Sequence, residues 1–209
     1  MPADQTQSWA YTEDVCTEDA ITIQARQQSR EYDIPALSPA TGAFLGVVAA
    51  TSRVRSAVEV GTGTGVSGLH LLRATSDIML TTIDVESEAQ HSARASFARA
   101  GIRAGRARII NGRSADILPR LADRSYDLVL VDGDPLEAPG DVQEALRMLR
   151  PGGLLVLAHA LMNGRVADPA RREVDVVTIR NLGKDLLESS DLRTALVPVG
   201  DGLLLATLR

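Results

Sequence analysis

The sequence predicts an α/β protein with a Rossmann-like, doubly wound sheet. We expect a mostly parallel sheet with helices on both faces and a C-terminal antiparallel hairpin strand. Three observations predict this fold. Short apolar runs rich in Val, Ile and Leu alternate with segments of helical spacing, which is typical of a parallel sheet covered on both faces. A glycine-rich turn follows the first apolar run, and an aspartate ends the second. Two β-prone runs joined by Gly200-Asp201-Gly202 predict the hairpin.

The length of 209 residues fits a single domain. We expect residues 1–35 to form a polar, helical N-terminal extension and residues 36–209 to form the Rossmann-like core. Within the extension, the acids after Thr17 predict the start of a helix over residues 18–31. Ser38-Pro39 predicts the start of the next helix, because proline is favoured in a first helical turn.

The strands and helices of the core follow in alternation. We expect strands over residues 56–60, 78–83, 107–110, 126–131 and 154–157, and the hairpin over 194–199 and 203–208. We expect helices over residues 66–75, 86–100, 116–121, 141–149 and 174–188. Gly101 is a suitable C-terminal cap for one of these helices, and Pro151-Gly152-Gly153 follows another.

Composition excludes several classes of protein. The net charge is −5 and no long basic stretch occurs, which argues against a nucleic-acid binder. The arginines between residues 94 and 108 are interleaved with Ala and Gly and indicate a solvated helix edge. The N-terminus has no signal-peptide pattern, and the longest apolar run, residues 154–162, is far shorter than the roughly 20 residues of a membrane span. We therefore expect a cytoplasmic protein with neither nucleic acid nor membrane as partner.

The first predicted strand ends in the glycine-rich turn, and the second ends at Asp84. Glycines let the backbone turn sharply and let a ligand approach, and the following helix N-terminus points N–H groups at it. A carboxylate at the position of Asp84 can accept hydrogen bonds from both hydroxyls of a ribose, or it can cap the next helix. Gly63, Gly65 and Gly68 also satisfy G-x-G-x-x-G, so an NAD-dependent oxidoreductase is one alternative and a turn without a ligand is another.

An ordered set of motifs separates these alternatives. The segments are residues 37–45 (LSPATGAFL), 58–67 (VEVGTGTGVS), 81–86 (TTIDVE), 111–121 (NGRSADILPRL), 126–134 (YDLVLVDGD), 150–157 (RPGGLLVL) and 200–204 (GDGLL). Together they resemble the small class I S-adenosylmethionine-dependent O-methyltransferases of the catechol and caffeoyl-CoA type. A dehydrogenase offers no reason for GDGLL in a terminal hairpin.

The resemblance implies roles for individual residues. It places Asp84 on the ribose and Val85 beside the adenine of S-adenosylmethionine. Ser114 matches an adenine-binding serine, although it could equally cap the helix that follows. The residues expected around the methionine portion are Leu37, through its backbone, and Glu59, Gly61, Thr62, Gly63 and Ser67.

The resemblance weakens where the family holds a divalent metal. Asp132 matches the first metal aspartate, but the family's Asp-Asn pair is replaced by Ala158-His159 and its lysine base by Pro135. Metal dependence is therefore uncertain, with Asp132 as the ligand if a metal binds. His159 could be a general base, a ligand of a softer metal together with Asp132 and Asp134, or part of the cleft wall.

These features predict an O-methyltransferase for a small hydroxylated, phenol- or catechol-like molecule. His159 and Asp132 are the expected catalytic residues, with Asp132 and Asp134 contacting the acceptor. The altered metal motif leaves the alternative of a methyltransferase-like protein that binds the cofactor without catalysis. The resemblance also implies a homodimer.

Overall fold

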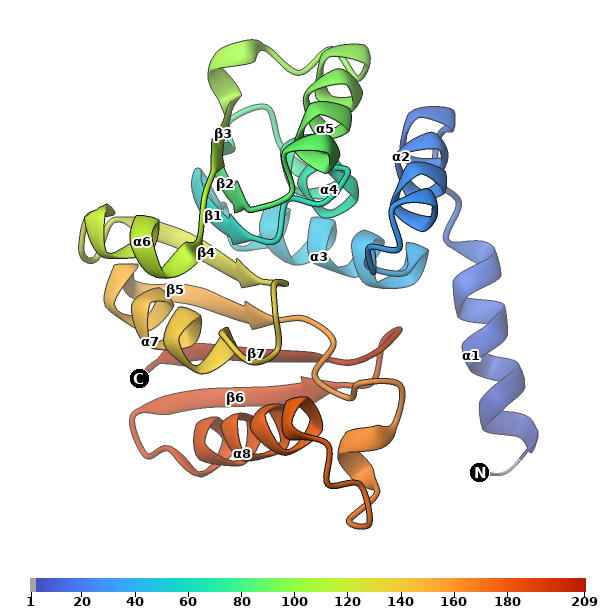
Figure 1. Cartoon of the computed structure of the whole chain (residues 1–209), viewed down its shortest axis with the longest axis vertical. Coiled ribbons are helices and arrows are strands. Elements are labelled where there is room, and N and C mark those ends of the chain that lie inside the picture. The colour runs from blue at the N-terminus through green and yellow to red at the C-terminus, as the bar shows by residue number, and fades with distance from the viewer. Residues whose placement is uncertain (1–2) are drawn as a thin grey trace.

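The computed structural model describes residues 3–209, which form one mixed sheet covered by helices on both faces (Figure 1). The order of the strands across the sheet is β3-β2-β1-β4-β5-β7-β6. All neighbours pair in parallel except β7, which is antiparallel to β5 and to β6. The strands are β1 (Ser56–Val60), β2 (Met79–Asp84), β3 (Ala107–Asn111), β4 (Tyr126–Val131), β5 (Leu149–Leu157), β6 (Leu192–Val197) and β7 (Leu203–Leu208). The predicted fold class is confirmed.

The helices alternate with the strands, as predicted. They are α1 (Ala3–Val15), α2 (Ala20–Glu31), α3 (Pro39–Thr51), α4 (Val66–Ala74), α5 (Ser87–Arg99), α6 (Ser114–Ile117), α7 (Ala138–Met148) and α8 (Val174–Glu188). Three 3₁₀ turns are η1 (Ala104–Arg106), η2 (Leu118–Arg120) and η3 (Arg165–Ala167). Asp19 caps α2 by accepting from the Thr22 N–H, and Ser38 caps α3 by accepting from the Thr41 N–H.

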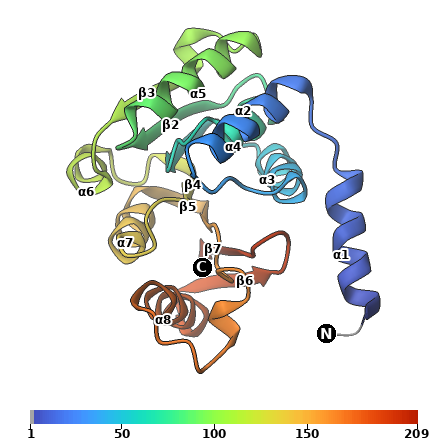
Figure 2. The same ribbon diagram turned by 45° about the vertical axis from the view of Figure 1, so that its right-hand side comes forward.

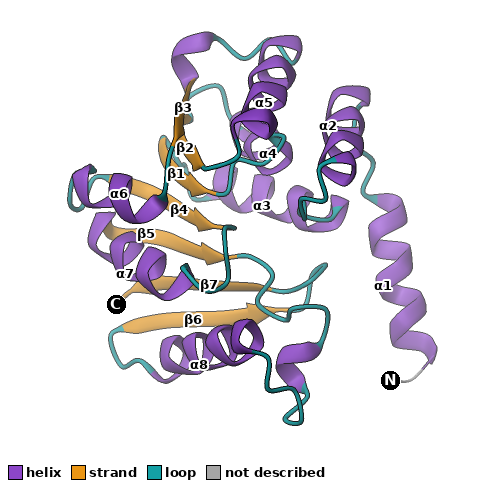
Figure 3. Ribbon diagram, viewed as in Figure 1, coloured by secondary structure: helices purple, strands orange, loops and turns teal. Residues whose placement is uncertain are grey.

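Helices cover both faces of the sheet (Figure 3). The side chains of the strands alternate between two hydrophobic cores, one on each face. Strand β4 shows why, because successive side chains of a strand point to opposite faces. Leu128 and Leu130 belong to the core that includes Leu45 of α3 and Leu69 of α4. Val129 belongs to the core that is formed with α7 and α8. Because β4 is buried on both sides, its sequence is a nearly continuous apolar run.

The winding of the sheet reverses between β1 and β4, and ligands of doubly wound proteins bind at such a switch point. Here the backbone after β1 closely approaches the backbone after β4. Gly61 has φ +95°, and a β-carbon on it would lie 2.2 Å from the Asp132 carbonyl oxygen. Only glycine fits this position, because any β-carbon would clash with the Asp132 carbonyl. The glycine-rich turn therefore lies directly beside Asp132.

Helix α1 was not predicted as a separate element. It lies to one side of the sheet and packs against α3 (Figures 1 and 2). Its sequence has no repeating apolar stripe, and Trp9, Tyr11 and Val15 are largely exposed. Periodicity therefore gave no signal for it. Within residues 3–209, no helix combines the length and apolar character that crossing a bilayer requires.

Candidate cofactor and acceptor site

A large pocket opens at the carboxyl ends of β1, β2, β4 and β5, where the fold predicts a ligand. Its volume is about 1560 Å³. Its walls also include the loop after β3, the turn between β6 and β7, and residues of α1 such as Trp9. Typical ligand pockets measure roughly 300–1,000 Å³, so this pocket has room for a nucleoside cofactor and a second small molecule together.

Asp84 ties the glycine-rich turn to the end of β2. Its Oδ2 accepts a 2.8 Å hydrogen bond from the Gly63 N–H, and its Oδ1 accepts a 2.9 Å bond from the Glu86 N–H. Each carboxylate oxygen has a second lone pair, so both can accept a further donor from the pocket. Glu86, the N-cap residue of α5, makes no side-chain capping bond. Asp84 thus contacts the helix start and still faces the pocket, where its contact with a ribose stays a prediction.

A chain of buried hydrogen bonds holds the glycine-rich turn on the side away from the pocket. Gln90 Nε2 donates to Thr62 Oγ1, which lies 2.7 Å from Thr82 Oγ1, and Thr82 Oγ1 donates to Glu59 Oε2. Burial raises the pKa of Glu59 to about 8, although hydrogen bonds from Ser67 and Thr82 counter it. Glu59 lies beneath the pocket wall rather than in it. Its role is therefore to hold Thr62 and Ser67, which do line the pocket.

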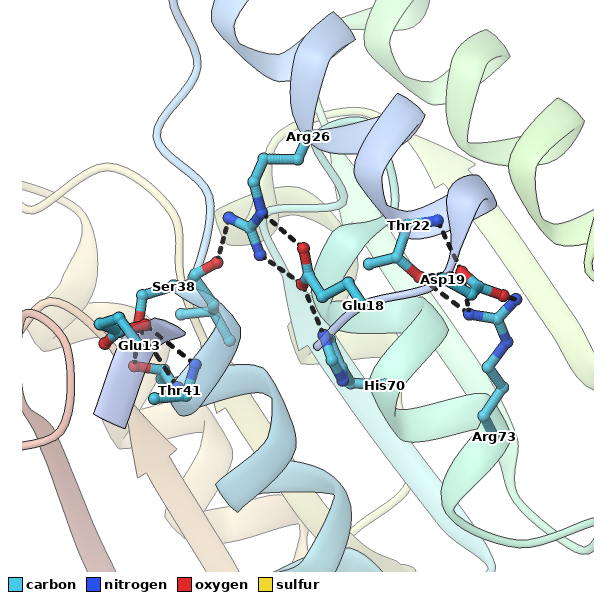
Figure 4. Close-up of polar contacts among 11 residues, drawn as sticks. Glu13, Glu18, Asp19, Thr22, Arg26, Ser38, Thr41, His70 and Arg73 are labelled. Atoms are coloured by element: carbon cyan, nitrogen blue, oxygen red, sulfur yellow. Dashed lines mark hydrogen bonds and ion pairs between the residues drawn. The ribbon is translucent and has the colours of Figure 1, made fainter. Parts of the chain in front are cut away.

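The segment before α3 is held by α2. Arg26 donates from its η1 nitrogen to the Leu37 carbonyl oxygen at 2.5 Å and pairs through its other nitrogens with Glu18 (Figure 4). Glu18 also lies 3.1 Å from Nε2 of His70. Burial raises the pKa of Glu18, but the bonds and charges of Arg26 and His70 outweigh it and lower the pKa to about 2. Arg26 thus fixes the backbone at Leu37, which lines the pocket.

Helix α1 is attached to the same segment by one carboxylate. Glu13 Oε1 accepts from the Ser38 hydroxyl at 2.7 Å, and Glu13 Oε2 accepts from the Ala40 N–H at 3.0 Å (Figure 4). Glu13 thus satisfies donors in the first turn of α3, where a negative charge is favoured by the helix dipole. This contact places α1, and with it Trp9, at the mouth of the pocket.

His159 follows β5 and lies between two carboxylates. Its Nδ1 is 3.1 Å from Asp201 Oδ2, and its Nε2 is 3.3 Å from Asp132 Oδ1. Burial lowers the pKa of His159, but the two carboxylates outweigh it and raise the pKa to about 10. The imidazole is therefore a cation at neutral pH, which argues against the base role considered for it. Nε2 forms an ion pair with Asp132, but the geometry of this contact is not that of a hydrogen bond. Within the described residues, Nε2 has no hydrogen-bond partner.

The structure brings the sequence-predicted residues together. The pocket is lined by Leu37, Gly61, Thr62, Gly63, Ser67, Asp84, Val85, Ser114, Asp132, Asp134 and His159, and of the predicted set only Glu59 stays outside its wall. Sequence reasoning missed Asp201, although the flanking glycines marked its turn. It also missed Arg26 and Glu13, whose contacts cross from one helix to another and leave no local pattern.

A divalent metal does not fit the residues where the family resemblance would place one. Ala158 has no side-chain oxygen to offer, whereas a hard cation such as Mg²⁺ prefers oxygen ligands. Both ring nitrogens of His159 face carboxylates, and a protonated imidazole has no lone pair for a metal. Across residues 3–209, no group of three His, Cys, Asp or Glu side chains is arranged to hold a metal ion. We therefore derive no catalytic step through a metal.

Comparisons with known proteins agree with this geometry. A family model described as O-methyltransferase matches residues 8–209. A protein of Mycobacterium avium (strain 104), provisionally named an O-methyltransferase, is 46% identical over 94% of this chain and 89% of its own. The crystal structure of the O-methyltransferase TomG from Streptomyces achromogenes, involved in tomaymycin synthesis and solved with S-adenosylmethionine, is 30% identical with a TM-score of 0.86, covering 100% of this chain and 99% of that one.

A second solved structure, of a Corynebacterium glutamicum protein, is 34% identical with a TM-score of 0.86 and covers 95% of this chain and 94% of that one. The family match extends over nearly the whole chain, and the S-adenosylmethionine-bound relative shares its fold from end to end. The chain belongs to the O-methyltransferase family and is an S-adenosylmethionine-dependent enzyme.

Proposed function

We propose that the protein methylates a small phenol- or catechol-like hydroxyl without a divalent metal. One observation carries this proposal. The Asp132–His159–Asp201 cluster, which supplies a carboxylate and an imidazolium, lies in the same pocket as the glycine-rich turn and Asp84. A proton acceptor and a positive charge are thus within reach of a molecule that shares the pocket with the cofactor.

The cofactor-binding part of the pocket suits S-adenosylmethionine. Asp84 keeps free lone pairs for the ribose hydroxyls, and Val85 offers an exposed apolar surface to the adenine. In this proposal the backbone of Leu37 and the turn from Gly61 to Gly63, which line the pocket, contact the methionine portion. Bound there, S-adenosylmethionine supplies a methyl group on an electrophilic sulfonium.

The remaining task of the protein is to make the acceptor oxygen nucleophilic. A phenol resembles tyrosine with a pKa near 10, so ionising it at pH 7 requires about 4 kcal/mol of help. In this proposal Asp132 accepts the hydroxyl proton, a role suited to a carboxylate whose pKa is raised by burial. The His159 imidazolium, held by Asp201, then offers its Nε2–H and its charge to the developing phenolate. Trp9 provides an aromatic wall for the acceptor ring.

The test is transfer of labelled methyl from S-adenosylmethionine to a panel of phenols and catechols, with and without EDTA. We expect transfer to at least one acceptor and the same rate in EDTA. His159→Gln is expected to lower kcat by about 10²–10³-fold, as for the loss of an electrostatic donor. Asp132→Asn is expected to lower it by about 10²–10⁴-fold, as for the loss of a general base.

His91→Gln is the matched control, because His91 is an exposed histidine on α5. It should leave the rate unchanged. A rate that is lost in EDTA and restored by Mg²⁺ would contradict the metal-free mechanism. Cofactor binding with no transfer to any acceptor would favour the alternative of a protein that binds without catalysis.

A further inference from the structure

Two buried polar atoms, one in the pocket wall and one behind it, make no hydrogen bond. In the described part of the chain, neither Ser114 Oγ nor Asp141 Oδ2 makes a hydrogen bond. Ser114 is 5% exposed and Asp141 is 3% exposed, so water does not satisfy them at the surface. An unsatisfied buried polar group costs roughly 1–3 kcal/mol, and a carboxylate costs more. A pair of such groups at a pocket indicates a place where a bound ligand completes the hydrogen bonds.

Ser114 lies in the pocket wall, and Asp141 lies behind it. Ser114 opens α6 and lines the pocket directly after β3. Asp141 lies on α7, which packs against α6, and a β-carbon on Gly133 would be 4.0 Å from Asp141 Oδ2. Asp141 is not itself part of the pocket wall. Any effect of Asp141 on a ligand therefore passes through Ser114.

The sequence left open whether Ser114 caps a helix or contacts adenine. In the structure the N-cap residue of α6 is Arg113, and the Ser114 hydroxyl bonds to no backbone N–H. The capping role is thus absent, and the hydroxyl remains free for a ligand. Ser114 opposes the rise in the pKa of the Asp141 carboxyl, so the two groups are neighbours, but no hydrogen bond joins Ser114 Oγ to Asp141 Oδ2.

We propose that Asp141 is a positioning residue that turns the Ser114 hydroxyl so that it accepts a hydrogen bond from the exocyclic amino group of adenine. The proposal rests on the cofactor placement given above. A serine hydroxyl has one proton and two lone pairs. Once its proton is donated to Asp141, only lone pairs face the pocket, so the ligand must present a donor. Adenine presents an amino group at this position, whereas hypoxanthine presents a carbonyl oxygen.

The charge state of Asp141 agrees with this arrangement. Burial raises its pKa to about 6, with Ser114 opposing the rise and Glu137 and Asp134 adding to it. At pH 7 the carboxylate is the main form, and a carboxylate only accepts hydrogen bonds. The Ser114 proton is therefore drawn to Asp141 rather than to the base.

The test compares binding of S-adenosylhomocysteine with binding of S-inosylhomocysteine by calorimetry at pH 7.5. These probes differ at the 6-substituent that Ser114 would meet and at the adjacent N1, which is an acceptor in adenine and an N–H in hypoxanthine; the Ser114 and Asp141 variants isolate the contribution of the 6-substituent. We expect the wild-type protein to prefer the adenosyl compound by about tenfold, the size of one lost hydrogen bond with an unpaired partner. Ser114→Ala and Asp141→Leu should each reduce this ratio to about twofold or less, because Leu cannot hold the hydroxyl.

Two further variants separate positioning from structure. Asp141→Asn keeps an acceptor oxygen and should retain most of the ratio. Asp116→Asn makes the same chemical change at an exposed position of α6 and should retain all of it. Asp141→Leu removes an unsatisfied buried charge but introduces a bulkier apolar group, so the two effects oppose each other and we expect the melting temperature to stay close to that of the wild type.

The outcomes distinguish the two proposals. If Asp141→Leu keeps the wild-type ratio while Ser114→Ala loses it, the role of Asp141 is overturned and the cofactor placement stands. If the wild-type protein binds both compounds equally, the adenine contact of Ser114 is overturned as well. If Asp84→Ala also leaves binding of S-adenosylhomocysteine unchanged, the cofactor placement itself fails.

Discussion

At the scale of single residues, Asp84 carries the largest share of the proposed cofactor recognition. It holds Gly63 and Glu86 and keeps acceptor positions for two hydroxyls. Hydrogen bonds to a charged group contribute about 1.5–3 kcal/mol each. Asp84→Ala should therefore raise the Kd for S-adenosylmethionine by about 10–100-fold in calorimetry. Asp77→Ala, at an exposed turn before β2, is the control. An unchanged Kd for Asp84→Ala would refute the ribose contact.

Glu18 predicts a dependence of stability on pH. Its pKa is about 2 in the folded protein and 4.5 as the usual value. A group whose pKa is depressed by folding stabilises the fold above its unfolded pKa. This contribution is complete above about pH 4.5 and is lost as the pH falls towards 2. In urea unfolding, the free energy of unfolding should fall less steeply with decreasing pH for Glu18→Gln than for the exposed control Glu31→Gln. Parallel pH curves for the two variants would contradict the ion-pair assignment.

At the scale of elements, α2 holds the segment before α3 that contains Leu37. Arg26→Ala would leave Glu18 without its strongest partner and the Leu37 carbonyl without a donor. Removing one partner of a buried pair costs about 3–5 kcal/mol. We expect unfolding free energy to fall by an amount of that order and cofactor affinity to fall with it. Arg99→Ala, which removes an exposed contact between α5 and Gln24 of α2, should cost far less. Equal losses in both variants would argue against this support.

The elements also show what could be predicted from the sequence. The bounds of β1, β4, β7 and α8 agree with the prediction, because apolar runs and helical spacing are local signals. Strand β5 begins at Leu149 rather than at residue 154, since the sheet accommodates Pro151-Gly152 as an irregularity beside β4. Helix α6 begins at Ser114 instead of residue 116 and continues into η2.

The site residues also fall into those that the sequence could locate and those that it could not. Gly61, Asp84 and Asp132 follow strands directly, so strand ends in the sequence located them. Asp201 could not be assigned a partner, because its contact with His159 spans 42 positions and depends on β7 pairing with β5. The imidazolium state of His159 was likewise beyond the sequence, because it depends on both carboxylates being close.

At the scale of the whole molecule, bound cofactor should stabilise the fold. A ligand at 100 times its Kd adds about 2.7 kcal/mol to stability. S-adenosylmethionine should therefore raise the melting temperature, and NAD should not. A rise with NAD alone would support the oxidoreductase alternative.

The family resemblance also predicts a homodimer, which sedimentation velocity can measure. The exposed Trp9 and Tyr11 of α1 are candidates for such a contact. A monomer at micromolar concentration would contradict this prediction.

The position of β7 between β5 and β6 has a consequence for synthesis on the ribosome. The strands of the nucleotide-binding half are translated before the turn that carries Asp201. A product terminated before Gly200 would leave the edge of β5 unpaired and prone to aggregation. It would also lack Asp201, the group that holds His159, so the proposed chemistry requires the turn that leads into β7.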